Sequence, residues 1–390
     1  MGLAETIFWI SLFVLLYTYI GYALLLFIFN WFKGLFFARK AIQPLQALPS
    51  IALIVPSYNE AANLKQKIEN CLQILYPADK LQVIIITDGS TDASNSIVKR
   101  YPQVTLLQAS TRQGKMAAIN RAVAGVQAPW LLFSDANTLL NNTCIQKLLP
   151  HIADQHTGGI AGEKKIRFNH RSSIELGEGL YWKYESTLKK LDSDFNTVVG
   201  AAGELFCMRT SLFTAQPEDT LLDDFILSAA ICLQGYKVAY EPGAFALEEA
   251  SANLAEERKR RVRIAAGAFQ SLFRLPGLLN IFKHPLLSFQ YISRRVFRWL
   301  LCPVALVALF ITNLFLFVQQ GGLFANLFFI QIGLYVLVAT GWLFYRLHIR
   351  FPILFVPFYF VFMNVSLVQG FFKYITGKQS VLWEKSKRSS

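Results

Sequence analysis

Long apolar stretches lie at the two ends of the chain, and shorter apolar runs lie in its middle. Residues 7–29 form a nearly unbroken apolar run, long enough to span the roughly 30 Å hydrocarbon core of a membrane. Three further apolar stretches, at about 300–318, 323–344 and 352–372, have similar length and composition. This pattern predicts a multi-pass integral membrane protein, with transmembrane helices on both sides of a central domain.

The middle of the chain has the pattern of a soluble α/β domain. Residues 51–55, 83–86, 104–107 and 130–133 are short apolar runs without alternation, which is typical of strands buried on both faces of a parallel sheet. Apolar residues with helical spacing lie between these runs. Alternating strands and helices predict an α/β fold with a doubly wound, mostly parallel sheet.

The charges around the first apolar run predict its orientation. A signal peptide would need a basic start and a small-residue cleavage site, whereas the start carries Glu5 and no Lys or Arg. Lys33, Arg39 and Lys40 follow the run. By the positive-inside rule, we expect the N-terminus outside and the central domain in the cytosol.

The charge rule leaves the side of the C-terminus open. Three spans after the central domain would put the tail outside, yet Lys373, Lys378 and Lys385 argue for the inside. Either the last apolar segment, which contains prolines, is re-entrant, or the tail departs from the rule. The predicted divisions are an N-terminal transmembrane helix (1–32), a cytosolic domain (50–266), amphipathic interfacial helices (267–298), a C-terminal transmembrane bundle (299–373) and a basic tail (374–390).

Composition agrees with a membrane protein. Hydrophobic residues make up 54% of the chain and charged residues only 16%, against about 25% in an average soluble protein. The net charge of +13 would suit nucleic acid, but beside apolar ends it is better explained by cytosolic flanks and anionic lipid. We therefore expect membrane lipids and no nucleic acid as partners. The five cysteines show no CxxC spacing, which predicts buried thiols without disulfides or a zinc site.

Acidic and polar residues follow three of the predicted strands. The first strand leads to Glu60, the second to Asp88, and the fourth to Asp135 and Asn137. A single Asp after a strand is usually a helix cap or turn residue, which is our expectation for Asp92. Three acidic strand ends on one rim would repel each other unless a divalent metal or the N–H donors of a base lie among them.

Other charged residues suit a phosphate site next to this rim. Lys115 stands at a predicted helix start, where backbone N–H groups and a cation favour a phosphate. Asp223 and Asp224 also begin a helix, where they either favour the helix dipole or include a general base. Arg260 and Arg263 belong to a basic cluster that is a lipid-headgroup patch, a solvated helix face or a diphosphate clamp.

In their order and spacing, these motifs resemble those of the membrane-integrated family 2 glycosyltransferases. That group includes cellulose, hyaluronan and poly-N-acetylglucosamine synthases and ceramide glucosyltransferases. The resemblance covers about residues 51–267. The matching positions are the opening Val55-Pro56-Ser57-Tyr58-Asn59-Glu60, Asp88, Gly114-Lys115, Ser134-Asp135-Ala136-Asn137 in place of DxD, Leu222-Asp223-Asp224 in place of T-E-D, and Arg260 to Arg263 in place of Q-x-x-R.

The resemblance implies a GT-A-type fold, the fold of nucleotide-diphospho-sugar transferases. It implies inverting transfer of a sugar from a nucleotide-sugar, expected to be a UDP-sugar, to a hydroxyl of a lipid-linked or membrane-presented glycan acceptor. Asp224 would be the catalytic base with Asp223 beside it, and Asp135 and Asn137 would hold Mg²⁺ or Mn²⁺. The implied nucleotide-sugar-binding residues are Pro56, Tyr58, Glu60, Asp88, Lys115, Asp135, Arg260 and Arg263. The expected location is a bacterial cytoplasmic (inner) membrane, with the catalytic domain facing the cytosol.

Two motifs depart from the family pattern. Asn137 offers a neutral oxygen where the family has Asp, so Asp135 is the one charged metal ligand expected. Ile264 stands where processive synthases have a Trp that helps hold the acceptor, and Arg260 replaces Gln. These departures favour a single transfer. A processive polysaccharide synthase with a secretion channel and a non-catalytic nucleotide-binding membrane protein are the alternatives.

Overall fold

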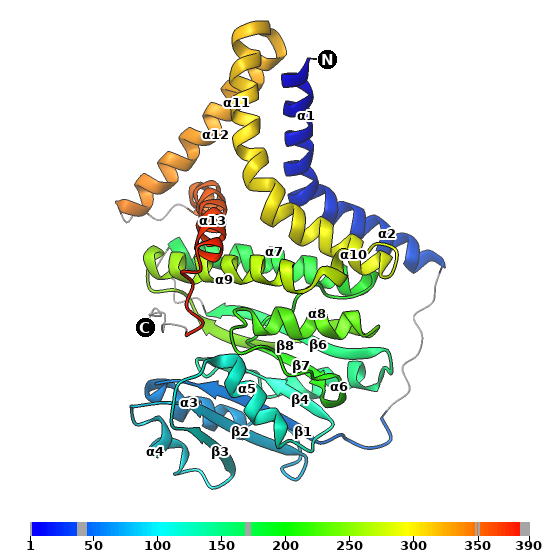
Figure 1. Cartoon of the computed structure of the whole chain (residues 1–390), viewed down its shortest axis with the longest axis vertical. Coiled ribbons are helices and arrows are strands. Elements are labelled where there is room, and N and C mark those ends of the chain that lie inside the picture. The colour runs from blue at the N-terminus through cyan, green and yellow to red at the C-terminus, as the bar shows by residue number, and fades with distance from the viewer. Residues whose placement is uncertain (1, 37–44, 168–172, 348, 350–351, 383–390) are drawn as a thin grey trace.

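The structure is a computed structural model, and it describes residues 2–36, 45–167, 173–347, 349 and 352–382. A sheet-based domain lies at one end of the molecule and a group of upright helices at the other (Figure 1). Two long helices, α7 (Ser173–Phe195) and α9 (Leu254–Arg274), lie between these parts. The predicted fold class, an α/β domain with long apolar helices from both ends of the chain, is confirmed.

A mixed sheet forms the centre of the domain. Among the described residues it has eight strands in the order β3-β2-β1-β4-β7-β6-β8-β5. The strands are β1 (Ile51–Ser57), β2 (Leu81–Asp88), β3 (Val104–Ala109), β4 (Trp130–Phe133), β5 (Thr138–Leu140), β6 (Thr157–Arg167), β7 (Phe206–Arg209) and β8 (Lys237–Glu249). β1 is parallel to β2 and β4, β2 to β3, and β6 to β8, whereas β7 is antiparallel to both its neighbours and β5 to β8. The four apolar runs predicted as strands are β1 to β4.

Helices cover both faces of this sheet, which explains why the apolar runs do not alternate. Ile54 of β1 belongs to the core on one face, together with residues of α5 and α8. Its neighbour Leu53 belongs to the core on the other face, together with residues of α3 and α6. The helices of the domain are α3 (Ala61–Leu72), α4 (Ser94–Val98), α5 (Lys115–Ala124), α6 (Cys144–Ala153), the short η2 (Thr210–Leu212) and α8 (Asp223–Leu233).

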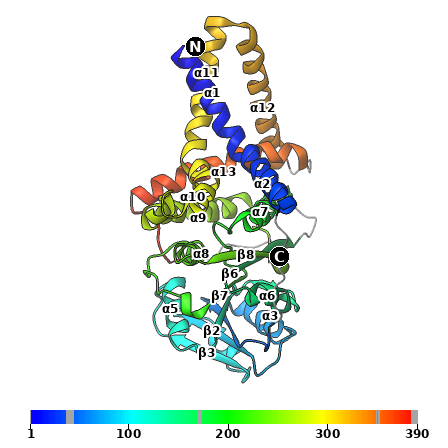
Figure 2. The same cartoon turned by 90° about the vertical axis from the view of Figure 1, so that its right-hand side faces the viewer.

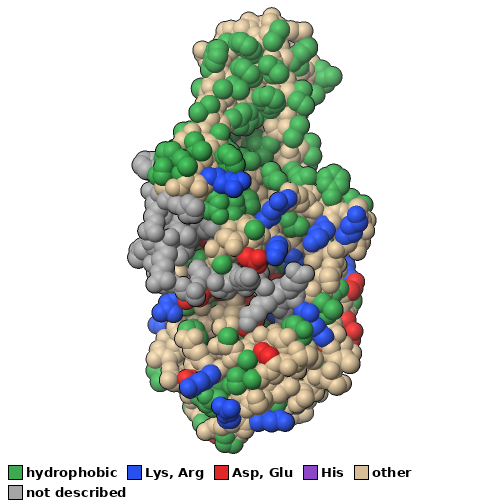
Figure 3. Space-filling model, turned by 90° about the vertical axis from the view of Figure 1, so that its left-hand side faces the viewer, with side chains coloured by type: hydrophobic (Ala, Val, Ile, Leu, Met, Phe, Trp, Pro, Cys, Tyr) green, Lys and Arg blue, Asp and Glu red, His purple; other side chains and the backbone are tan. Residues whose placement is uncertain are grey.

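Four helical runs are long and apolar enough to cross a membrane, by length and composition, within the described part of the chain. They are Leu3–Phe36, Pro285–Gln320, Gly322–Arg346 and Leu354–Ile375. On the face drawn in Figure 3, hydrophobic side chains cover the upper part, and Lys, Arg, Asp and Glu lie mostly below it. The elements concerned are α1 (Leu3–Leu16), η1 (Tyr17–Gly21), α2 (Tyr22–Phe36), α10 (Pro285–Tyr291), η4 (Ile292–Leu301), α11 (Cys302–Gln320), α12 (Gly322–Arg346) and α13 (Pro352–Ile375), with η3 (Pro276–Leu279) just after α9.

Buried ion pairs join the apolar helices to α7. Arg294 of η4 pairs with Glu185, at 2.8 Å, and with Asp192, and all three side chains are buried. Tyr22 of α2 donates a hydrogen bond to the same Asp192. Within residues 267–298, which we expect to lie on a membrane surface, Arg294 is buried and has the carboxylate partners that a buried arginine needs. The position of the segment as a whole stays a prediction.

Helix α13 is oriented differently from the upright helices. It is seen end-on in Figure 1 and lengthwise in Figure 2, so it lies across the base of α1, α11 and α12, next to α9. Beyond it, Val381 reaches within 3.4 Å of where a Cβ on Gly114 would stand. The described end of the tail therefore lies beside the sheet domain, and the side of the membrane on which both lie stays a prediction. Three residues of the charge argument, Arg39, Lys40 and Lys385, lie outside the described residues.

The close packing of α13 on α9 predicts the effect of adding one methyl group. A Cβ on Gly370 would lie 2.3 Å from Cβ of Ala265 and 2.8 Å from the carbonyl oxygen of Val262. Gly370→Ala is therefore expected to destabilise the protein by about 1–3 kcal/mol through overpacking, despite the helix propensity that Ala gains. The melting temperature of the purified protein in detergent measures this effect.

Gly333→Ala is the matched control, since Gly333 also lies in an apolar helix but has nothing within 4 Å of the added Cβ. It should leave the melting temperature unchanged or raise it. Equal melting temperatures for the two variants would contradict the tight packing of α13 against α9.

Candidate active site

The loops that follow β1 and β2 hold each other at the edge of the sheet. Asn59 has a φ of 51°, a left-handed conformation that Asn tolerates better than most residues. Its side-chain oxygen accepts hydrogen bonds from the backbone N–H groups of Thr91 (2.8 Å) and Asp92 (3.3 Å). The carboxylate of Asp92 accepts from the N–H groups of Ala61 and Ser94, which begin α3 and α4. Asp92 therefore accepts from the first N–H group of each helix, although the N-cap positions themselves are Glu60 and Ala93.

Asp88, at the end of β2, supports the start of α5. Its carboxylate is fully buried and accepts hydrogen bonds from the N–H groups of Gln113 (3.0 Å) and Gly114 (2.6 Å). The same carboxylate pairs with Arg121 at 2.7 Å. Because α5 begins at Lys115, Asp88 fixes the position of that lysine. The predicted contact of Asp88 with a nucleotide base stays a prediction.

Lys115 bridges two of the predicted carboxylates. Its ammonium lies 2.8 Å from Asp135, which follows β4, and 3.1 Å from Asp223, which begins α8. Burial acts to lower the pKa of Lys115, but Asp135, Asp223 and Asp224 outweigh burial and raise the pKa above its usual value. Lys115 is therefore a permanent positive charge at the meeting point of these acidic residues.

Asp224 is held at the start of α8 by two backbone donors. Its Oδ2 accepts from the N–H of Gly203 at 2.7 Å, and its Oδ1 accepts from the N–H of Phe225 at 2.7 Å. Burial, followed by the charge of Asp223, raises the pKa of Asp224 to about 7, although Lys115 acts against the rise. A positioned carboxylate with a pKa near neutrality is chemically suited to take up a proton at cellular pH.

The loop from Ser134 to Thr138 rests on a buried lysine. The ammonium of Lys67 donates to the hydroxyl of Ser134 at 2.7 Å and to the carbonyl of Thr138 at 2.9 Å. Within this loop, the amide nitrogen of Asn137 donates to Glu248 at 3.1 Å. Hydrogen bonds with Lys67 and with Glu248 thus hold the loop in place.

The donor atoms on this loop suit a hard divalent cation. Asp135 offers carboxylate oxygens and Asn137 an amide oxygen, and Mg²⁺ and Mn²⁺ prefer such ligands. No group of three or more His, Cys, Asp or Glu side chains with the geometry of a metal site occurs among the described residues. The protein's own contribution to a cation here would be these two side chains.

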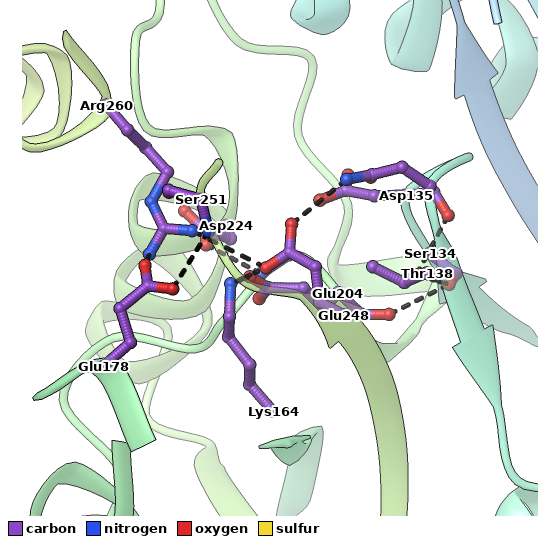
Figure 4. A network of polar contacts seen from close by, with 12 residues as sticks. Ser134, Asp135, Thr138, Lys164, Glu178, Glu204, Asp224, Glu248, Ser251 and Arg260 are labelled. Atoms are coloured by element: carbon purple, nitrogen blue, oxygen red, sulfur yellow. Dashed lines mark hydrogen bonds and ion pairs between the residues drawn. The ribbon is translucent and has the colours of Figure 1, made fainter. Parts of the chain in front are cut away.

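A network of buried ion pairs forms another wall of the site (Figure 4). Lys164 of β6 pairs with Glu204 and with Glu248 of β8. Arg260 of α9 lies 3.0 Å from Glu178 and 3.7 Å from Glu248. The guanidinium of Arg260, which we predicted to contact the nucleotide-sugar, is thus surrounded by carboxylates of the protein.

Arg263 lies on α9 nearer to the aspartates. Burial lowers the pKa of Arg263, while Asp223, Asp135 and Asp224 act to raise it. These opposing effects indicate a partly desolvated guanidinium close to all three carboxylates. Arg263 is therefore a cation whose charge, like that of Lys115, interacts with all three carboxylates.

One cavity of about 790 Å³ collects nearly all the predicted site residues. Asp88 is the one predicted residue that does not line it. Those that do are Pro56, Tyr58, Glu60, Lys115, Asp135, Asn137, Asp223, Asp224, Arg260 and Arg263. The cavity continues to the apolar helices, where Tyr19, Trp299 and Phe360 line it. Residues from 19 to 382 along the chain thus share one space that reaches from the strand ends to the apolar helices.

Several cavity residues were not predicted from the sequence. They include Lys164 of β6, Lys189 of α7, and Lys378 and Leu382 of the tail. None of these belongs to a motif with fixed spacing. Glu204, which also lines the cavity, ends the glycine-marked run 198–204, a pattern that indicates backbone suited to line a groove.

Part of the chain matches a known protein family. Residues 52–215 match the family described as "Glycosyl transferase family 2". Poly-beta-1,6-N-acetyl-D-glucosamine synthase of Staphylococcus aureus (strain COL) is 26% identical over 239 residues, which cover 58% of this chain and 56% of the relative. Beta-monoglucosyldiacylglycerol synthase of Synechocystis sp. is 26% identical over 235 residues, which cover 57% and 48%. The chain therefore spans about half the length of these curated relatives.

The fold also resembles a solved structure over nearly its whole length. A mannosyltransferase from Pyrobaculum calidifontis, solved in complex with GDP-Man and Mn²⁺, superposes with a TM-score of 0.68 at 21% identity. The match covers 97% of this chain and 100% of the other. At this identity the likeness concerns the fold alone. Residues 52–215 thus form a family 2 glycosyltransferase domain with a GT-A-type fold, and four long apolar helices lie outside this match in the described part of the chain.

Proposed function

We propose that the protein is an inverting glycosyltransferase, with its catalytic domain in the cytosol. It moves a sugar from a nucleotide-sugar to a hydroxyl of a lipid-linked or membrane-presented acceptor. The observation that carries this proposal is the position of Asp224. A carboxylate with a pKa of about 7 shares one cavity with Lys115 and Asp135, and that cavity continues to the apolar helices.

The donor diphosphate is proposed to lie between Lys115, Arg263 and Asp135. The two cations would offset the negative charge that develops on the leaving diphosphate, and they cost no reorganisation because the protein already holds them in place. Asp135 and Asn137 would hold Mg²⁺ or Mn²⁺, which supplies further charge neutralisation when bound. We assign Arg260 mainly a structural role in the network of buried ion pairs beside the site, because its guanidinium already contacts Glu178 and Glu248.

Asp224 is proposed to act as the general base. It takes the proton of the acceptor hydroxyl while the hydroxyl oxygen attacks the anomeric carbon and the bond to the diphosphate oxygen breaks. A single displacement of this kind inverts the anomeric carbon. The hydrogen bond from Gly203 keeps the carboxylate oriented, and Asp223 keeps Lys115 beside it.

Processive polymer synthesis is the second candidate. Its support is the similarity to a poly-N-acetylglucosamine synthase over 58% of the chain. Against it stands Ile264, which lines the cavity at the position where the processive family members have Trp. The mass of the product separates the two, since a single transfer adds one sugar and a synthase gives a ladder of lengths.

Asp224→Asn tests the assignment of the base. We expect kcat to fall by about 10²–10⁴-fold, the usual contribution of a general base, with nucleotide-sugar affinity retained. Release of nucleoside diphosphate from a panel of UDP- and GDP-sugars, with membrane lipids as acceptors, measures turnover, and calorimetry measures donor binding. If the unchanged protein releases no diphosphate with any donor, the transferase proposal fails and the non-catalytic alternative remains.

The raised pKa of Asp224 also predicts how stability changes with pH. A carboxyl with a pKa of about 7 in the folded protein favours its protonated form there. Its contribution to stability is therefore present below about pH 4 and is lost as the pH rises through 7. Asp224→Asn should stabilise the substrate-free protein at pH 8 by about 2–4 kcal/mol, and by less at pH 5. Melting temperatures at both pH values provide the measurement, with the exposed Asp79→Asn as a control expected to show no pH-dependent gain.

Metal dependence tests the roles of Asp135 and Asn137. Chelation with EDTA should abolish diphosphate release, and added Mn²⁺ or Mg²⁺ should restore it. Asn137→Asp adds a charged ligand and should lower the metal concentration needed for half-maximal activity by about tenfold, because ligand charge tunes affinity. Asn142→Asp, which adds the same charge at an exposed position, should leave it unchanged. An unchanged metal requirement in Asn137→Asp would show that position 137 is not a ligand.

A further inference from the structure

The part of the cavity nearest the apolar helices contains hydrogen-bond donors that have no acceptors. Lys189 of α7 lines the cavity and is only 4% exposed. Within the described part of the chain, its ammonium has no hydrogen bond and no ion pair. Its recorded contacts are with the rings of Trp182 and Tyr240, each 5.9 Å from the ammonium to the ring centroid.

Trp182 adds a second donor of this kind. It also lines the cavity, and its buried indole N–H has no acceptor among the described residues. Trp182 and Lys189 are seven residues apart on α7, so they lie on the same face of the helix. Buried donors are almost always paired, so two unpaired donors on one face point to an acceptor-rich group that binds between them.

The charges around this face are also unbalanced. Lys189, Arg294, Arg295 and Arg298 lie close together, and the carboxylates among them are Glu185 and Asp192. Arg294 contacts both carboxylates, and Arg298 contacts Glu185. Arg295 donates to the carbonyl of Val199, at 2.8 Å, and lies 4.0 Å from Glu185. Four cations thus share two carboxylates.

The nearest other carboxylate does not restore the balance, because Glu204 pairs with Lys164. The titration of Lys189 agrees with this charge distribution. Burial first, and Arg294 next, lower the pKa of Lys189 to about 8, as expected for a buried cation with too little negative charge around it.

We propose that Trp182, Lys189, Arg295 and Arg298 bind a phosphate group carried by the acceptor, close to the hydroxyl that Asp224 deprotonates. This inference rests on the proposed function, since it names the chemical class of acceptor for the same cavity. A phosphate offers several strong acceptor oxygens, and both Arg and Lys bind it well. The phosphate is a recognition group and is not itself attacked.

The surroundings fit a phosphate attached to a lipid. Beyond the cations, the cavity is lined by Tyr19 and Trp299 and by Phe360 and Met363 of α13. These aromatic and apolar side chains suit the apolar part of an acceptor that enters from the membrane. The donor diphosphate is assigned to Lys115 and Arg263, beside Asp135, so the two anionic groups have separate cations.

Binding of lipid in the absence of donor tests this proposal. The full chain in detergent is titrated with dioleoylphosphatidylglycerol, with uncharged dioleoylglycerol, and with inorganic phosphate, and tryptophan fluorescence reports binding because Trp182 and Trp299 line the cavity. We expect phosphatidylglycerol to bind more tightly than dioleoylglycerol. Lys189→Met should weaken phosphatidylglycerol binding by about tenfold or more, the loss expected for a charge-assisted contact, and Lys189→Arg should largely retain it.

Lys183→Met is the matched control. Lys183 is exposed on the same helix, and the substitution removes the same charge from the surface. It should leave binding unchanged. Competition by inorganic phosphate would show that the phosphate alone is recognised, and no competition would show that the lipid part is also needed. Equal weakening by Lys183→Met and Lys189→Met, or equal binding of the charged and uncharged lipids, would overturn the proposal.

The same assay separates this proposal from the proposed function. Asp224→Asn should bind phosphatidylglycerol as well as the unchanged protein does, whether or not a sugar is ever transferred. Normal turnover by Asp224→Asn, with lipid binding retained, would refute only the assigned base. Normal turnover onto an uncharged lipid, unaffected by Lys189→Met, would refute only the phosphate site.

Discussion

The contact on which the site depends is the bridge from Lys115 to Asp135 and Asp223. Three carboxylates meet in this cavity, and without a cation among them the end of β4 and the start of α8 would repel each other. Lys115 holds them together because Asp88 fixes the start of its helix through two backbone N–H groups. Since Lys115 is shared between two other carboxylates, it only partly offsets the burial of Asp224, and the pKa of Asp224 remains near 7.

The same principle joins the membrane helices to the enzyme. Arg294 is fully buried between Glu185 and Asp192, and the hydroxyl of Tyr22 donates a hydrogen bond to Asp192. Breaking such a group would leave an unpaired buried charge, so the apolar helices cannot separate from α7 at low cost. Because Glu185 lies on the face of α7 that also lines the cavity through Trp182 and Lys189, the position of the apolar helices and the shape of this part of the cavity are set together.

The sequence predicted those parts of the fold that burial alone determines. Strands β1 to β4 are covered on both faces, so they appear as apolar runs, and the upright helices appear as long apolar stretches. The direction of α13 was not predictable, because hydropathy measures length and apolarity, while its orientation depends on the contact of Gly370 with Ala265. Likewise, the motifs that follow the strands identified most of the residues that line the cavity. Single residues such as Lys164 and Lys189 belong to no motif, and only the three-dimensional fold brings them there.

The replacement of the usual second aspartate by Asn137 is explained by its neighbour. Glu248 is buried and accepts a hydrogen bond from the amide of Asn137 at 3.1 Å. A carboxylate at position 137 would face Glu248 as a like charge, in a region where Lys164 and Arg260 already contact Glu248. Asn137 instead donates to Glu248 and can still offer an oxygen to the cavity. The loop therefore carries one carboxylate, Asp135, and the neighbouring negative charge lies on Glu248 of β8, where Lys164 contacts it.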